Sequence, residues 1–183
     1  MKKLLIAAII LLPFISKAQT AGPFGYKSED RYLYYGNVVD VDASFTVADL
    51  YKDAKSFITK LSLANTKIIT DDEQGGIVAV SIEEPATFKT QTGIGNEQMT
   101  LKYNIKLELK KGRYRYTFDN ILLTYIDKDN KNEVHTLYDV DKGKSGGLIG
   151  VGRSKRVLKA MDELFMQKID LLNHIMKKKS DDF

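Results

Sequence analysis

The sequence contains no cysteine and no tryptophan, and it has only two histidines and three prolines. The absence of cysteine excludes disulfides, thiolate metal ligands and a lipid anchor on cysteine, so the folded chain must be stabilised by packing alone. His135 and His174 have no partner at metal-ligand spacing, and we therefore expect neither a zinc site nor histidine-based catalysis. The absence of tryptophan removes a favourable ring for stacking on sugars, which argues against a lectin.

The first eighteen residues have the layout of a secretory signal peptide. Lys2 and Lys3 precede an apolar run over residues 4–15, and Ser16–Ala18 is a small-x-small cleavage motif. The run spans twelve residues, whereas a membrane-spanning helix needs about 20. We therefore expect cleavage after Ala18, no transmembrane segment in the mature chain, and a periplasmic or secreted location.

Removal of the signal peptide changes the charge of the chain. The whole sequence has 28 basic and 24 acidic residues, and three of the lysines fall within residues 1–18. The mature chain therefore keeps 25 basic residues against 24 acidic ones, a net charge of +1. This balance gives no support to a nucleic-acid partner.

The 165 residues after Ala18 suit one domain of moderate size. We expect a flexible leader over residues 19–30 and a strand over 31–41 that is interrupted at Gly36-Asn37. A helix over 46–62 follows, with Thr46 and Asp49 as a capping box. Short strands over 67–70 and 77–82 come next, followed by a mobile loop over 84–98.

The stretch from 99 to 118 predicts a hairpin. Apolar and polar residues alternate strictly on both sides of Lys111-Gly112, which predicts two half-buried strands joined by a two-residue turn. That turn sets Leu107 opposite Tyr116 on the buried side and Glu108 opposite Arg115 on the solvent side. The alternation then changes phase, which predicts a bulge at Asp119-Asn120.

The remainder of the chain, residues 127–183, is expected to pack on the same domain, itself placed at 31–126. We predict a polar turn over 127–132, an edge strand over 134–140, a Gly-rich loop over 143–152 and an amphipathic helix over 154–176. The order strand, helix, strands, helix predicts an α+β fold, with a mostly antiparallel sheet and helices packed on one face.

A serine hydrolase is the one enzymatic alternative that the sequence suggests. Residues 143–147 match G-x-S-x-G with Ser145 at the nucleophile position, and Asp170 and His174 follow in the order of an α/β-hydrolase. That mechanism needs a mainly parallel sheet, and no strand–helix alternation precedes the motif. We therefore interpret the segment as a connection into the last helix and predict that the protein is not an enzyme.

Phosphate and calcium motifs fail at required positions. Basic residues over 144–156 flank a helix start that favours anions, but Tyr138 stands where a Walker A loop needs glycine. Asp127 and Asp129 have calcium-loop spacing, but Asn132 stands where that loop also requires glycine. We expect no cofactor and no metal.

Four basic residues are the candidate binding residues. By strand parity and hairpin register they share the solvent face of the sheet, where an anionic glycan or a partner protein could bind; they are Lys102, Lys106, Arg113 and Arg115. A charged outer face also serves to keep a domain soluble, and this alternative stays open.

Two segments carry a family resemblance. The helix segment 50–58, with Tyr51 and Ala54, and the strand segment 111–118, with its Gly-Arg-Tyr-Arg-Tyr run, resemble an exported bacterial family of unknown function described as having a TATA-binding-protein-like (TBP-like) fold. Phe57 stands where that family has tryptophan. The resemblance covers roughly residues 34–126 and implies a curved antiparallel sheet backed by helices, with no known activity or functional residues.

From these observations we expect an exported, non-catalytic envelope module. The hypothesis is that it binds an envelope protein or a glycan through the open sheet face or the 84–98 loop. The alternatives are the serine hydrolase and a structural envelope subunit without a discrete ligand.

Overall fold

The computed structural model of the chain describes residues 25–29, 31–61, 65–89, 96–126, 131–143 and 151–177. The predicted signal peptide, its cleavage point and Ser145 lie outside the described residues. So do residues 90–95, the middle of the predicted mobile loop.

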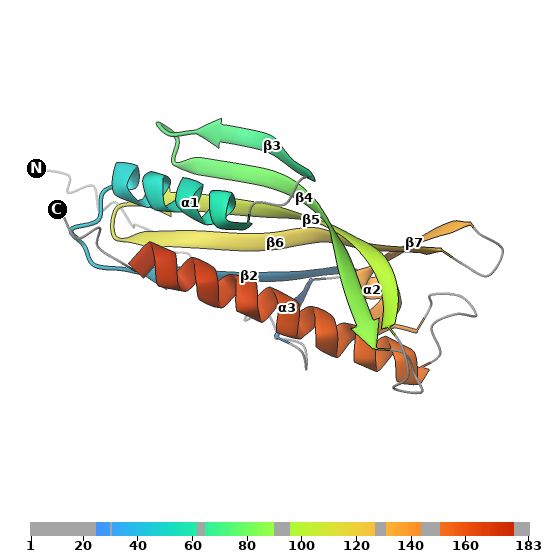
Figure 1. Cartoon of the computed structure of the whole chain (residues 1–183). Helices are drawn as coiled ribbons and strands as arrows, with labels where there is room; N and C mark the ends of the chain where they lie inside the picture. The colour runs from blue at the N-terminus through green and yellow to red at the C-terminus, as the bar shows by residue number, and fades with distance from the viewer. Residues whose placement is uncertain are drawn as a thin grey trace, which may run out of the picture.

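Seven antiparallel strands form one sheet in the order β1-β2-β6-β5-β4-β3, with β7 pairing to β6. Figure 1 shows α1 and α3 on the same side of this sheet, so the predicted α+β fold with helices on one face is confirmed. In chain order the elements are β1 (Lys27–Glu29), β2 (Tyr32–Asp40), α1 (Val47–Leu61), β3 (Asn65–Asp72), β4 (Ile77–Lys89), β5 (Asn96–Lys110), β6 (Arg113–Ile126), β7 (Asn132–Thr136), α2 (Leu137–Asp141) and α3 (Val151–Lys177).

The start of α1 is built as the sequence predicts. The Asp49 backbone N–H donates to the Thr46 hydroxyl at 3.2 Å, and the Thr46 N–H donates to the Asp49 carboxylate at 2.8 Å. This reciprocal pair satisfies backbone donors that the first helical turn cannot. Phe45 and Leu50, just before and inside the helix, are both buried in the core.

The β5–β6 hairpin and its bulge are confirmed. Leu107 pairs with Tyr116 and Glu108 with Arg115 across the turn. The register shifts after Lys102, and Asn120 in β6 has a φ of 50°, a left-handed conformation that asparagine tolerates better than most residues. The extra residue keeps Ile121 and Leu123 on the buried side, as a bulge must.

Three predictions about strand extent and continuity are wrong. β2 runs without interruption through Gly36-Asn37, because both residues pair with β6. Residues 84–89 and 96–98, which we expected in a loop, belong to the long β4 and β5 strands and pair with each other. Residues 27–29, expected in a flexible leader, form β1.

The predicted strand over 134–140 is wrong in its second half. β7 ends at Thr136, which caps the short helix α2 through a second reciprocal bond with Asp139. Leu137 and Val140, three residues apart, are both buried. Helical spacing of these two side chains, together with the cap, outweighs the β-branched residues in this segment.

The core lies between the sheet and the two long helices. Its centre is an aromatic cluster in which Phe165 of α3 stacks on Tyr35 at 4.7 Å between ring centroids and meets Tyr103 and Phe118 edge-on. Because α3 contributes the central ring, it belongs to the same core as the sheet.

One charged pair is buried in this interface. Lys168 of α3 lies 3.1 Å from the Glu84 carboxylate of β4, and the two side chains are 11% and 8% exposed. The Tyr103 hydroxyl donates to the same carboxylate at 3.0 Å. The pair ties α3 to the middle of the sheet.

Candidate functional site

The candidate site is the face of the sheet opposite α1 and α3, which we call the open face. Along β5 and β6 the residues alternate between buried and exposed positions, and the buried set joins the core with the helices. The structure places all four candidate binding residues among the exposed set: Lys102, Lys106, Arg113 and Arg115.

The four basic residues do not form one cluster, because acidic residues lie between them. The Glu108 carboxylate forms ion pairs with both Lys106, at 3.2 Å, and Arg115, at 3.8 Å. Arg113 instead lies 3.5 Å from Asp40 on β2, and Lys102 pairs in register with Glu83 on β4. These residues of the open face therefore form a pattern of alternating positive and negative charge.

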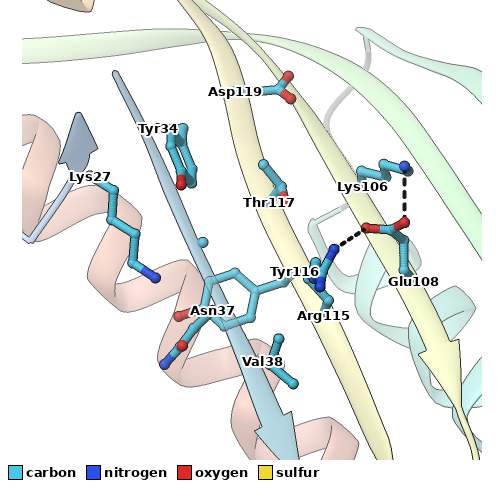
Figure 2. A pocket seen from close by; sticks show the side chains of 11 residues that line it. Lys27, Tyr34, Asn37, Val38, Lys106, Glu108, Arg115, Tyr116, Thr117 and Asp119 are labelled. Atoms are coloured by element: carbon cyan, nitrogen blue, oxygen red, sulfur yellow. Dashed lines mark ion pairs between the residues drawn. The ribbon is translucent and has the colours of Figure 1, made fainter. Parts of the chain in front are cut away.

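A recess of about 490 Å³ lies in this face near the end of β1. Figure 2 shows its lining, which comes from four neighbouring strands: Lys27 of β1, Tyr34, Gly36, Asn37 and Val38 of β2, Arg115, Tyr116, Thr117 and Asp119 of β6, and Lys106 and Glu108 of β5. The recess thus contains the Lys106–Glu108–Arg115 group and an aromatic wall.

Gly36 and Tyr34 shape the floor of the recess. A Cβ added at Gly36 would lie 3.1 Å from the Tyr34 ring and 3.1 Å from the Tyr116 carbonyl oxygen. The Tyr34 ring therefore lies against the glycine, and a side chain there would displace it. Tyr34 also packs on Tyr32, with 5.6 Å between ring centroids.

Tyr32 and Asp119 form a polar contact at the end of the recess. Partial burial and a hydrogen bond to the Asp119 carboxylate raise the pKa of the Tyr32 phenol above its ordinary value. The phenol is therefore neutral at physiological pH and acts as a donor to Asp119 rather than as a base.

Of the residues that line the recess, the sequence identified only Lys106 and Arg115 as candidate binding residues; Lys27 and Val38 are two of those that it missed. Lys27 lies in a segment expected to be a flexible leader, and Val38 was interpreted only as part of a strand.

The structure describes two of the three residues of the hydrolase alternative. Asp170 and His174 are both exposed on α3, one turn apart. The sheet pairs only antiparallel strands, unlike the mainly parallel sheet that a nucleophile elbow requires. Within the described ranges there is no group of three or more metal-ligating side chains.

A second polar cluster lies on the β6–β7 hairpin. The His135 ring stacks on Tyr125, and its Nε2 lies 3.1 Å from the Tyr125 hydroxyl and 3.3 Å from the Glu133 carboxylate. Tyr125 also donates to Glu133. These contacts hold β7 against β6 by side-chain pairing across the strands.

Residues 35–124 match the family described as a domain of unknown function, DUF4468, with a TBP-like fold. This segment contains β2 to most of β6, including the Tyr51 helix and the Gly112 hairpin. The domain at residues 35–124 belongs to the DUF4468 family. The resemblance in the sequence is thereby confirmed, together with the TBP-like fold that it implied.

Two crystal structures resemble this DUF4468 protein. A DUF4468 family protein from Bacteroides ovatus matches with a TM-score of 0.59 at 15% identity, over 87% of this chain and 94% of that chain. A TBP-like protein from Parabacteroides distasonis matches with a TM-score of 0.59 at 14% identity, over 80% and 96% of the two chains. At these identities the likeness shows the fold alone.

Two further findings concern the sequence and the helices of the DUF4468 protein. No curated protein matches the sequence. Within the described ranges, no helix has the length and apolar character needed to cross a membrane.

Proposed function

We propose that this DUF4468 protein is an exported, non-catalytic module of the cell envelope that binds a partner protein or glycan through its open face. The observation that supports the proposal is the recess near the end of β1. It brings aromatic, aliphatic and charged groups of four strands to one exposed surface. Helices α1 and α3 pack on the other face and leave this one accessible (Figure 1).

The charges around the recess favour an anionic partner. Lys106 and Arg115 share one carboxylate, Glu108, so the group of three carries a net positive charge. Lys27 adds another cation from the opposite side of the recess and Asp119 adds an anion, so the lining has three cations against two anions, a net charge of +1. Exposed pairs of this kind contribute only about 0–1 kcal/mol to stability, so their positions are available for recognition without being needed for folding.

Reversal of charge at the recess tests this proposal. We expect the double variant Lys106→Glu, Arg115→Glu to lose most capture of its partner from an envelope extract at low salt, and to differ less from wild type at high salt, where exposed charges are screened. Stability should change by no more than about 0.5 kcal/mol per site, as is usual for exposed positions.

Lys60→Glu is the matched control, since Lys60 is exposed in the last turn of α1, on the opposite face. Capture should survive this change. Unchanged capture by the double variant, or equal loss in the control, would contradict recognition through the open face and favour a structural subunit without a discrete ligand.

A further inference from the structure

The outer edge of β2 is only partly covered. β1 is three residues long and pairs with Tyr32 to Tyr34, whereas β6 pairs with Tyr35 to Asp40 from the other side. Within the described residues, no strand pairs with the outer edge beyond Tyr34. Since a β-strand rises about 3.3 Å per residue, the uncovered stretch over 36–40 is about 17 Å long.

The backbone direction shows which peptide groups face outward. The Val41 N–H donates to the Gly112 carbonyl at 2.9 Å, toward β6 and its turn. In antiparallel strands the N–H and C=O of one residue point to the same side, and successive residues alternate. Val39 and Asn37 therefore point toward β6, and Gly36, Val38 and Asp40 present their N–H and C=O groups to the outer edge.

The chain at the N-terminal end of β1 is held in place by the core. Gly25, two residues before β1, has a φ of 77°, a left-handed conformation that glycine adopts readily. The next residue, Tyr26, is 2% exposed and donates to Asp141 of α2. Its ring packs edge-on against Tyr35 at 6.3 Å. Within the described residues the pairing of β1 with β2 thus ends at Lys27, and Gly25 lies against Asp162 of α3.

Opposite charges mark the two ends of the uncovered edge. Lys27, the first residue of β1, lines the recess and extends toward Asn37 (Figure 2). It makes no ion pair with any residue that the structure describes. At the far end, Asp40 is 78% exposed and only loosely paired with Arg113. Val38, between them, presents a 45% exposed aliphatic side chain.

We propose that the partner binds as an extended peptide segment that adds a strand to the outer edge of β2, in line with β1. We take the guest as antiparallel to β2, the same orientation as β1. In that orientation an acidic residue at the C-terminal end of the guest meets Lys27, and a basic residue at its N-terminal end meets Asp40. The inference rests on the proposed function, because the guest occupies the edge of the same recess.

A second copy of this chain fits the edge less well. Self-pairing about Val38 would bury one strand edge of about 17 Å per protomer, and a stable interface needs about 1,000 Å² in total. Self-pairing also puts Asp40 of each copy near Lys27 of the other, but it buries no surface beyond the strand edge itself. A peptide needs only the edge and the recess beside it, as in other cases of strand addition.

Amide hydrogen exchange with two synthetic hexapeptides tests the proposal. The probe is KTVTVD, and its reversed sequence DVTVTK has the same composition with the charges exchanged. With KTVTVD we expect slowed exchange at the amides of Gly36, Val38 and Asp40, and no change at Asn37 and Val39, which already face β6. The reversed peptide should bind at least ten-fold more weakly, and Lys27→Glu should remove this preference.

Val38→Pro is the variant that acts on the backbone. Proline is tolerated on an edge strand where the N–H faces outward, so the variant should keep its circular dichroism and lose KTVTVD binding. Should it fail to fold, the exchange pattern of the wild-type protein still decides the matter.

Four results would overturn the inference. They are binding without amide protection, equal binding of the two peptides, no protection at millimolar peptide, and protection of the three amides by self-association alone. Loss of capture in the Lys106→Glu, Arg115→Glu variant together with no peptide protection would leave the proposed function standing and remove only strand addition. Peptide protection together with unchanged capture by that variant would instead remove the open face as the recognition surface.

Discussion

At the scale of single residues, the Glu84–Lys168 pair is the least expected feature of the molecule. Both side chains are almost fully buried, and Tyr103 donates to the shared carboxylate while its ring lies 5.8 Å from the Lys168 ammonium. Charges are buried in proteins when they are paired and hydrogen-bonded, since an isolated buried charge is strongly unfavourable. The pair therefore fixes where α3 crosses the sheet.

Removal of one member of this pair should be costly. We expect Lys168→Met to lower the free energy of unfolding by about 3–5 kcal/mol, because it leaves the Glu84 carboxylate buried without its counter-charge. Urea unfolding followed by circular dichroism measures the change.

The double variant Glu84→Met, Lys168→Met serves as the control for this prediction. It should recover most of the loss, because no unpaired charge remains. A single variant as stable as wild type, or a double variant no better than the single, would show that the pair contributes little.

At the scale of elements, local signals decide where helices begin and where strands turn. Thr46 with Asp49 and Thr136 with Asp139 build the same reciprocal cap at two helices of very different length. Gly112 has a φ of 71° in the hairpin turn, and a Cβ there would lie 3.3 Å from the Ala43 backbone. Cap and turn residues thus satisfy hydrogen-bonding and conformational requirements that arise within a few residues of them.

The α1 cap provides the prediction at this scale. We expect Thr46→Ala to reduce the free energy of unfolding by about 1 kcal/mol, because the backbone N–H of Asp49 loses its acceptor. Thr59→Ala is the control: the Thr59 hydroxyl donates to the Lys55 carbonyl within the same helix, and such bonds do not add to helix stability. Equal effects of the two variants in thermal unfolding would contradict the role of the cap.

At the scale of the whole molecule, the DUF4468 domain forms most of the sheet and α1, whereas β1, β7 and the core helix α3 lie outside the matched segment. The family match ends at residue 124, yet Phe165 and Lys168 make the central contacts beneath β4, β5 and β6. The two crystal structures match over 80% or more of this chain, so the shared fold extends beyond the matched segment. Location is a property that the fold leaves open.

Export gives the prediction for the whole molecule. We expect the product recovered from the envelope or the medium to begin at Gln19, because residues 1–18 have the layout of a cleavable signal. Mass spectrometry of the intact protein measures the N-terminus. A product that retains Met1, or that stays in the cytoplasm, would contradict the export prediction.

The sequence by itself determined the features that depend on neighbours within a few residues. Alternation along 99–118 and the two-residue turn specify the β5–β6 register, the change of phase specifies the bulge near Asn120, and Thr46 specifies the start of α1. It also placed the four basic residues on one face, since side-chain direction in a strand has a period of two. These features depend on residues close together in the sequence, and they do not depend on which strand or helix packs against them.

The tertiary structure decided whatever depends on pairing between distant segments. Only the presence of β6 keeps β2 continuous through Gly36, and only the mutual pairing of β4 and β5 turns a Pro-containing segment into long strands. The recess likewise exists because Lys27, Val38 and Arg115 come from three adjacent strands of the sheet, of which β6 is far from β1 and β2 in the sequence. The order of strands that are distant in the sequence is set by the energy of the assembled core, and no local pattern encodes which of these distant strands become neighbours.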